Sequence, residues 1–192
     1  MATDLRPLHV RALSDVPVSS VEVADLDRPT PCAGWDLGAL LSHMVGQHYG
    51  FALAVSTGDA AVADYDGTGG SAALADWAAS VERLTSAFAA ADLSAAVRLV
   101  EISPELRFPA GVAIGFQLLD TVIHAWDVAT ALGRDYRPDS ELVGPVLALA
   151  RRVPGGEARS RPGAAFGAEV SLPADSTDPW LAALALLGRR PA

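Results

Sequence analysis

The sequence has 192 residues, enough for one domain with a sizeable core, and 51% of them are hydrophobic, with alanine prominent. A net charge of −9 argues against nucleic acid or an anionic membrane surface as a partner. We see no signal peptide and no run of about 18 apolar residues, so we expect no membrane span. The one cysteine, Cys32, excludes an intrachain disulfide and fits the cytoplasm. We expect it to be a packing thiol, because nothing beside it in the sequence would activate it.

The composition and spacing of apolar residues predict an all-α fold in a single domain, residues 1–192. Alanine favours helix, β-branched clusters are few, and the long segments repeat at helical period. We therefore expect a four-helix bundle with short extra helices and one or two short extended segments. The long helices are expected at residues 4–16, 37–57, 71–91 and 110–132. Shorter helices are expected at residues 139–153 and 178–188, and extended segments at 95–103 and 166–172.

Irregular connectors separate these helices. Residues 28–36 contain two prolines and a glycine, which rule out regular structure there. Asp36 is expected to cap the helix that follows, and Gly58 to end it. Residues 18–28 indicate no more than a short helical turn. The basic loop at 151–163 carries arginines that either close over an anionic substrate or, as is more common, are solvated.

A polar stripe interrupts the apolar surface of the helix expected at 110–132. Asp120, His124 and Asp127 fall within an arc of roughly 60° on this helix. Burying a carboxylate without a partner is costly, and a cation on the stripe would remove that cost. Asp120 and His124 supply only two metal ligands, and His43 is the best candidate for a third. The alternative is an i,i+4 ion pair between Asp120 and His124, and spacing alone does not decide between the two.

His43 shares one helix face with Gly46, Gln47 and Gly50. Glycine inside a helix costs about 0.5–1 kcal/mol relative to alanine, so two of them beside a histidine need a reason. One reason is close backbone approach by another helix, and the other is an open pocket for a ligand. We expect Gln47 and Asp127 to orient imidazoles or polar substrate atoms. For Asp127, a simple helix hydrogen bond or ion pair is an equal alternative.

Four motifs in order resemble a known family. They are Thr30-Pro-Cys-Ala-Gly-Trp-Asp36, Leu40-Leu-Ser-His43, Asp120-xxx-His124-Ala-Trp-Asp-Val-Ala129 and Leu186-Leu-Gly-Arg-Arg-Pro191. Together they resemble the actinobacterial metal-binding proteins related to mycothiol-dependent maleylpyruvate isomerase, which belong to the DinB-like four-helix superfamily. The resemblance covers nearly the whole chain.

The resemblance implies a divalent metal, zinc in the first place and nickel as an alternative, held by His43, Asp120 and His124. It also implies mycothiol or another low-molecular-weight thiol as cosubstrate, a small-molecule substrate, and transferase or isomerase activity. A homodimer is a further expectation. Asp120 stands where the isomerase has glutamate, and the extra C-terminal region of longer members is missing, so the isomerase activity itself is not carried over. A non-catalytic DinB-like module that binds metal or a small ligand is the alternative function.

Overall fold

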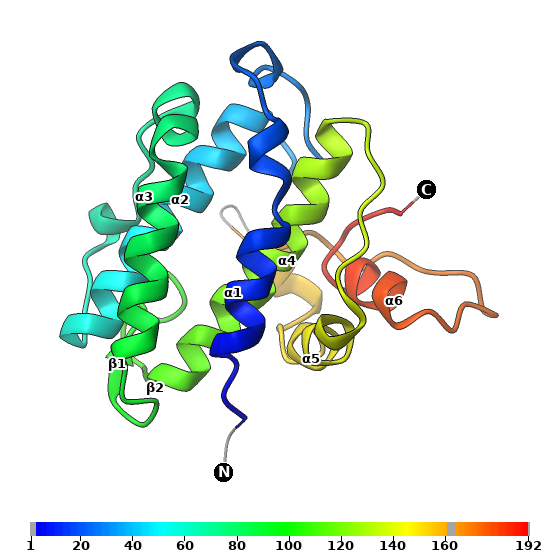
Figure 1. Ribbon diagram of the computed structural model, residues 1–192. Helices are drawn as coiled ribbons and strands as arrows, with labels where there is room; N and C mark the ends of the chain where they lie inside the picture. The colour runs from blue at the N-terminus through cyan, green and yellow to red at the C-terminus, as the bar shows by residue number, and fades with distance from the viewer. Residues whose placement is uncertain (1–2, 161–163, 192) are drawn as a thin grey trace. The chain divides into compact units, whose positions relative to one another are not determined.

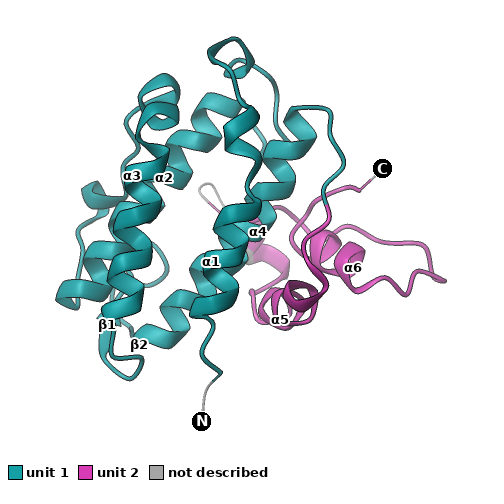
Figure 2. Cartoon of the chain, in the orientation of Figure 1, with its two compact units in different colours: residues 1–136 teal, residues 137–192 magenta. Residues whose placement is uncertain are grey.

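The computed structural model describes residues 3–160 and 164–191, and the chain divides into two compact units, residues 1–136 and 137–192 (Figure 2). Residues 161–163, at the end of the basic loop expected at 151–163, lie outside the described residues. The single domain expected for the whole chain stays a prediction.

The first unit is a four-helix bundle. Helix α2 packs against α3 and α4, and α1 packs against α4 and α3 (Figure 1). The long helices are α1 (Arg6–Asp15), α2 (Leu37–Thr57), α3 (Gly70–Ala90) and α4 (Ala110–Ala131). Short 3₁₀ helices lie between them: η1 (Pro17–Ser20), η2 (Val23–Asp25) and η3 (Val62–Tyr65). The predicted all-α bundle is confirmed, with bounds close to those expected.

Paired strands in the described residues are limited to one small antiparallel pair, beside an isolated bridge between Pro29 and Asp36. Strand β1 (Ala96–Arg98) pairs with β2 (Arg107–Pro109), so that Val97 lies opposite Phe108. The extended segment predicted at 95–103 is thus partly correct, but its strand is only three residues long.

The second unit holds two shorter helices. These are α5 (Ser140–Ala150), with a proline inside it, and α6 (Pro179–Leu186), with the 3₁₀ helix η4 (Gly156–Ser160) between them. The strand predicted at 166–172 is not found there. The Val170 N–H instead donates to the carbonyl of Ala185 at 2.9 Å, so this backbone bonds to a helix end and not to a partner strand.

Arg159 holds the second unit together from inside. Its guanidinium is buried and donates to the carbonyls of Pro154 at 2.8 Å and Val153 at 3.2 Å, and also to that of Leu186. A buried arginine needs such acceptors, because an unpaired buried charge is costly. The interpretation that the arginines of this loop are solvated is therefore wrong for Arg159.

Apolar side chains of the first unit pack into two clusters that fix α2 against α4. The cluster near the strands includes Phe51, Leu84, Phe88, Val97 and Ile114. The other, near the start of α2 and the end of α4, includes Leu40, Leu41, Met44, Val45 and Val128. This second cluster interleaves in sequence with the candidate ligands, so its packing sets their positions.

Helix α4 is long and apolar enough to cross a membrane by length and composition alone, the one such helix among the described residues. The sequence-based exclusion of a span counted consecutive apolar residues, whereas mean hydropathy tolerates the ionisable residues spread along α4. Of its most apolar stretch, 78% is buried inside the protein, as in the core helix of a bundle.

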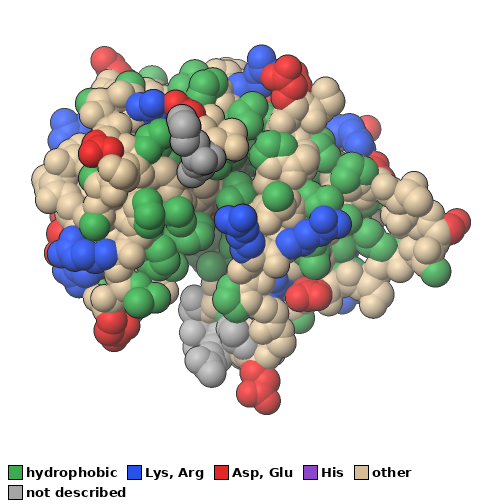
Figure 3. All heavy atoms as spheres, turned by 90° about the horizontal axis from the view of Figure 1, so that it is seen from below, with side chains coloured by type: hydrophobic (Ala, Val, Ile, Leu, Met, Phe, Trp, Pro, Cys, Tyr) green, Lys and Arg blue, Asp and Glu red, His purple; other side chains and the backbone are tan. Residues whose placement is uncertain are grey.

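On the face shown in Figure 3, acidic and basic side chains are interspersed among hydrophobic ones, and no histidine of the described residues is seen. Charge on this face is therefore mixed, although the chain as a whole carries a net charge of −9.

The start of α2 is fixed by the cap that the sequence predicts. The Asp36 carboxylate accepts the Ala39 N–H at 2.7 Å, and this satisfies one of the free N–H groups of the first turn. At the other end Gly58 has a φ of 87°, a left-handed conformation that glycine adopts at little cost.

We expect Asp36→Ala to lower the free energy of unfolding by about 1 kcal/mol, since the cap is lost. Asp36→Asn should keep nearly full stability, because asparagine caps as well. Urea denaturation of both variants measures this, and equal losses in the two would show that the cap does not hold the helix.

Two histidines are buried in the bundle away from the candidate ligands. His9 packs its ring on Phe88 with centroids 5.0 Å apart, and His48 Nδ1 lies 2.9 Å from Ser80 Oγ. Burial lowers the pKa of His9 to about 3 and that of His48 to about 4. At these two histidines the unfolded chain binds protons near pH 6.5 and the folded protein does not, so their contribution to stability is full above that pH and is lost as the pH falls.

As the pH of the metal-free protein falls from about 7.5 to about 5.5, above the range where most carboxylates titrate, we expect wild type to lose more free energy of unfolding than His9→Phe. The raised pKa of His124 acts in the opposite direction, but equally in both proteins. His9→Phe keeps the aromatic contact and removes the titrating group, so its stability should fall less over the same range. Chemical denaturation in chelator at several pH values tests this, and parallel curves for the two proteins would contradict it.

Candidate metal centre

The three predicted ligands converge between α2 and α4. His124 Nε2 lies 3.2 Å from Asp120 Oδ1, and His43 Nε2 lies 4.0 Å from the same oxygen. The two imidazole rings are 5.3 Å apart and stand at 81° to each other. One ligand atom from each residue lies within 4.8 Å of the others. A tetrahedral zinc ion spaces its nitrogen and oxygen ligands by about 3.3 Å, so small side-chain movements would fit the three to one ion.

Asp120 and His124 stabilise each other's charge. Burial alone raises the pKa of Asp120, but His124 and His43 outweigh it and hold that pKa far below its usual range. Burial likewise lowers the pKa of His124, but Asp120 and Asp127 outweigh it and raise that pKa well above 6.5. Without a metal the two residues therefore form the ion pair of the alternative interpretation.

One oxygen of this pair favours a cation at the site. Asp120 Oδ2 is buried and has no hydrogen-bond partner among the described residues. Buried carboxylate oxygens are rarely left without a donor or an ion. The donor set of two imidazoles and a carboxylate also suits zinc. The residues present therefore fit a divalent ion. The two histidine nitrogens lie near Oδ1, so an ion bound through both carboxylate oxygens would also satisfy Oδ2.

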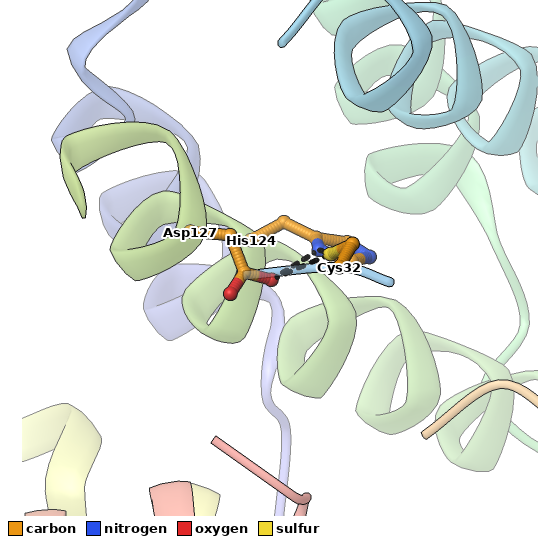
Figure 4. A group of neighbouring side chains, drawn as sticks. All are labelled: Cys32, His124 and Asp127. Atoms are coloured by element: carbon orange, nitrogen blue, oxygen red, sulfur yellow. Dashed lines mark hydrogen bonds and ion pairs between the residues drawn. The ribbon is translucent and has the colours of Figure 1, made fainter. Parts of the chain in front are cut away.

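The far side of His124 is held by two further groups (Figure 4). His124 Nδ1 lies 2.9 Å from Asp127 Oδ2, and Asp127 is fully buried. The Cys32 thiol donates to the same carboxylate oxygen at 3.2 Å, and its Sγ lies 3.9 Å from His124 Nδ1. The Asp127 contact fits both interpretations made of it, an orienting role and a simple helix hydrogen bond.

Sequence reasoning missed Cys32 as a neighbour of the site, because it lies 92 positions before His124. It missed Trp35 for a similar reason, since this residue precedes α2 yet packs its ring 4.8 Å from that of His43. The motif at residues 30–36 was the one sequence signal that pointed to this segment. It contributed to the family resemblance, but no role at the site was predicted for its side chains.

Gln47 is directed elsewhere. Its side-chain amide donates to Glu101 Oε2 at 2.6 Å, in the segment that follows β1. The structure thus gives Gln47 a carboxylate partner outside the three candidate ligands. Its expected role beside them stays a prediction.

The glycine face of α2 is filled by the chain itself. A Cβ at Gly46 would overlap the Tyr65 carbonyl oxygen, and a Cβ at Gly50 would overlap the Tyr65 ring. This geometry fits the first interpretation of the two glycines, close backbone approach, and not a pocket beside them. The approaching segment is the end of the 3₁₀ helix η3 with the residues that follow it, and not another α-helix.

The structure brings together, from two facing helices of a bundle, the histidine, carboxylate and second histidine that the resemblance to DinB-like metal-binding proteins implies. Residues 9–129 match the mycothiol maleylpyruvate isomerase N-terminal domain family, and the chain belongs to this family.

Two relatives are uncharacterized proteins from two strains of Mycobacterium tuberculosis. Each is 32% identical to this chain over 157 residues, which cover 81% of this chain and 81% of the relative. A solved structure of a histidine-to-alanine mutant of mycothiol-dependent maleylpyruvate isomerase has the same fold, with a TM-score of 0.59 and 16% identity. The match covers 81% of this chain and 69% of the isomerase chain.

We expect Gly46→Ala to lower the free energy of unfolding by about 1–3 kcal/mol, because the added methyl group displaces the Tyr65 backbone. Gly111→Ala is the matched control: its Cβ would lie 3.4 Å from the nearest atom, the Leu93 carbonyl oxygen. That variant should stay within about 0.5 kcal/mol of wild type. Urea denaturation compares them, and an unchanged Gly46→Ala protein would mean that the face is open.

Proposed function

We propose that His43, Asp120 and His124 hold a divalent ion, zinc in the first place, and that the protein is a metal-dependent, thiol-dependent transferase or isomerase. The observation that carries the proposal is the convergence of these three side chains, one ligand atom from each lying within 4.8 Å of the others. The second oxygen of the Asp120 carboxylate, Oδ2, is buried and has no hydrogen-bond partner among the described residues. Family membership supports a low-molecular-weight thiol, such as mycothiol, as the cosubstrate.

Three protein ligands suit catalysis better than structure, since structural zinc sites usually have four. A bound zinc ion lowers the pKa of a water or thiol in its open position and so supplies a nucleophile at neutral pH. Asp127 accepts the Nδ1–H of His124 and so directs Nε2 toward the ion. Access differs around the site: the His43 and Asp120 side chains are 27% and 22% exposed, whereas that of His124 is 4% exposed. The thiol and its electrophile therefore approach from the side of His43 and Asp120.

The substrate is proposed only as a small electrophile. Asp120 has a shorter side chain than the glutamate that the resemblance places there in the isomerase, so it would hold an ion on a shorter arm. The filled glycine face removes Gly46 and Gly50 as pocket residues. The isomerase reaction itself is therefore not carried over to this chain. The reaction with a reduced thiol fits the cytoplasm, where we propose that the protein works.

The first test is the metal content of protein purified without a histidine tag. We expect one equivalent of zinc for wild type, and loss of most of it in His43→Ala and Asp120→Ala, since each removes a ligand. Glu82→Gln, which changes an exposed carboxylate on α3, is the control and should keep the metal. Full metal in both ligand variants would refute the assigned site.

The second test is thiol transfer. Zinc-loaded wild type, mycothiol and a panel of small electrophiles that includes maleylpyruvate are assayed beside Asp120→Ala. We expect turnover with at least one electrophile and only the uncatalysed rate in the variant. Tight zinc binding without turnover on any member of the panel would favour the non-catalytic binding module.

A further inference from the structure

The connector before α2 is a hydrogen-bonded turn. Thr30 Oγ1 accepts the Cys32 N–H at 3.1 Å and donates to the Trp35 carbonyl at 2.8 Å. The Trp35 N–H donates back to the Cys32 carbonyl at 3.0 Å. Gly34, inside the turn, has a φ of 81°, which glycine adopts freely and other residues rarely do. The backbone of Cys32 is therefore fixed by the turn itself.

This turn contacts the candidate metal centre at two places. The Trp35 ring packs on His43 from α2, and the Cys32 thiol donates to Asp127 from α4. The turn thus touches both helices that supply ligands. Neither contact is needed to start α2, since the Asp36 cap does that separately.

The thiol lies on the side of His124 away from the candidate ion. Its Sγ is near Nδ1 (Figure 4). The other ring nitrogen, Nε2, faces Asp120. The two nitrogens of an imidazole point in different directions, so Cys32 cannot reach an ion held by Nε2, Asp120 and His43. Its chemistry here is that of a weak S–H donor to a carboxylate.

The thiol donor acts on a carboxylate that has no access to water. Asp127 is fully buried, and an ionised carboxylate in such a place depends on the donors around it. The Cys32 donor and the His124 Nδ1–H meet at the same oxygen, Oδ2. Removing the thiol hydrogen would weaken the hold on the atom that orients His124.

We propose that Cys32 is a positioning residue of the metal centre: its thiol holds the Asp127 carboxylate in the orientation that directs His124 Nε2 at the ion. This inference rests on the proposed metal site. It assigns a role to a residue for which the sequence alone predicts packing.

The test separates the donor from the shape of the side chain. Cys32→Ser keeps a donor, Cys32→Val keeps a similar volume without one, and Cys32→Ala removes both. Affinity for Co²⁺ is measured by competition with a chromophoric chelator, together with the visible and near-ultraviolet spectrum of the cobalt protein. Thermal melts of the metal-free proteins report folding.

We expect Cys32→Val and Cys32→Ala to bind Co²⁺ about three- to tenfold more weakly than wild type. This loss of affinity is smaller than that from removing a residue hydrogen-bonded directly to a metal ligand. Cys32→Ser should bind within about twofold of wild type, because its hydroxyl is also a donor. The wild-type spectrum should lack a thiolate-to-cobalt charge-transfer band, as no sulfur binds the ion.

Three results would overturn the inference. If folded Cys32→Val binds Co²⁺ as tightly as wild type, the donor is not needed. If Cys32→Val does not fold, equal affinity of Cys32→Ala and wild type shows the same. A charge-transfer band in wild type that Cys32→Ser abolishes would make Cys32 a ligand. Failure of wild type to bind cobalt would refute the proposed metal site and this inference with it. The first two results would leave the proposed metal site intact.

Discussion

The site depends on one imidazole held from both sides. His124 is buried, and each of its ring nitrogens faces a carboxylate: Nε2 faces Asp120 at 3.2 Å and Nδ1 faces Asp127 at 2.9 Å. All three residues lie on α4 within two turns, so the helix fixes their relative positions before any tertiary contact forms. What remains for the fold is to bring His43 and the turn of residues 30–36 to this arrangement.

The bundle brings His43 by apolar packing. The cluster of Leu40, Leu41, Met44, Val45 and Val128 seats the start of α2 against the end of α4. The backbone of Tyr65, at the end of η3, packs against Gly46 of α2, and this contact limits how α2 can rotate or shift. The second unit adds no residue to the ligand set described.

Local spacing was enough to predict the α4 half of the site. The i,i+4 relation of Asp120 and His124, and the i,i+3 relation of His124 and Asp127, follow from helical geometry alone. His43 was placed with them by the resemblance and by the scarcity of other candidates. The contacts of Cys32, Trp35, Tyr65 and Glu101 depend on how distant segments pack, and no periodicity in the sequence encodes that. The same limit explains why the sequence left open whether the two glycines line a pocket or meet an approaching segment, which is the end of η3.

The division of the ligands between a helix and its neighbour has a thermodynamic consequence. Any partly unfolded state that keeps α4 keeps two ligands, but only the docked bundle offers the third. An ion that binds the docked state alone stabilises it by an amount set by its concentration relative to Kd, about 2.7 kcal/mol at a hundredfold excess. Loss of an ion from the proposed site would therefore remove this part of the free energy that holds α2 against α4.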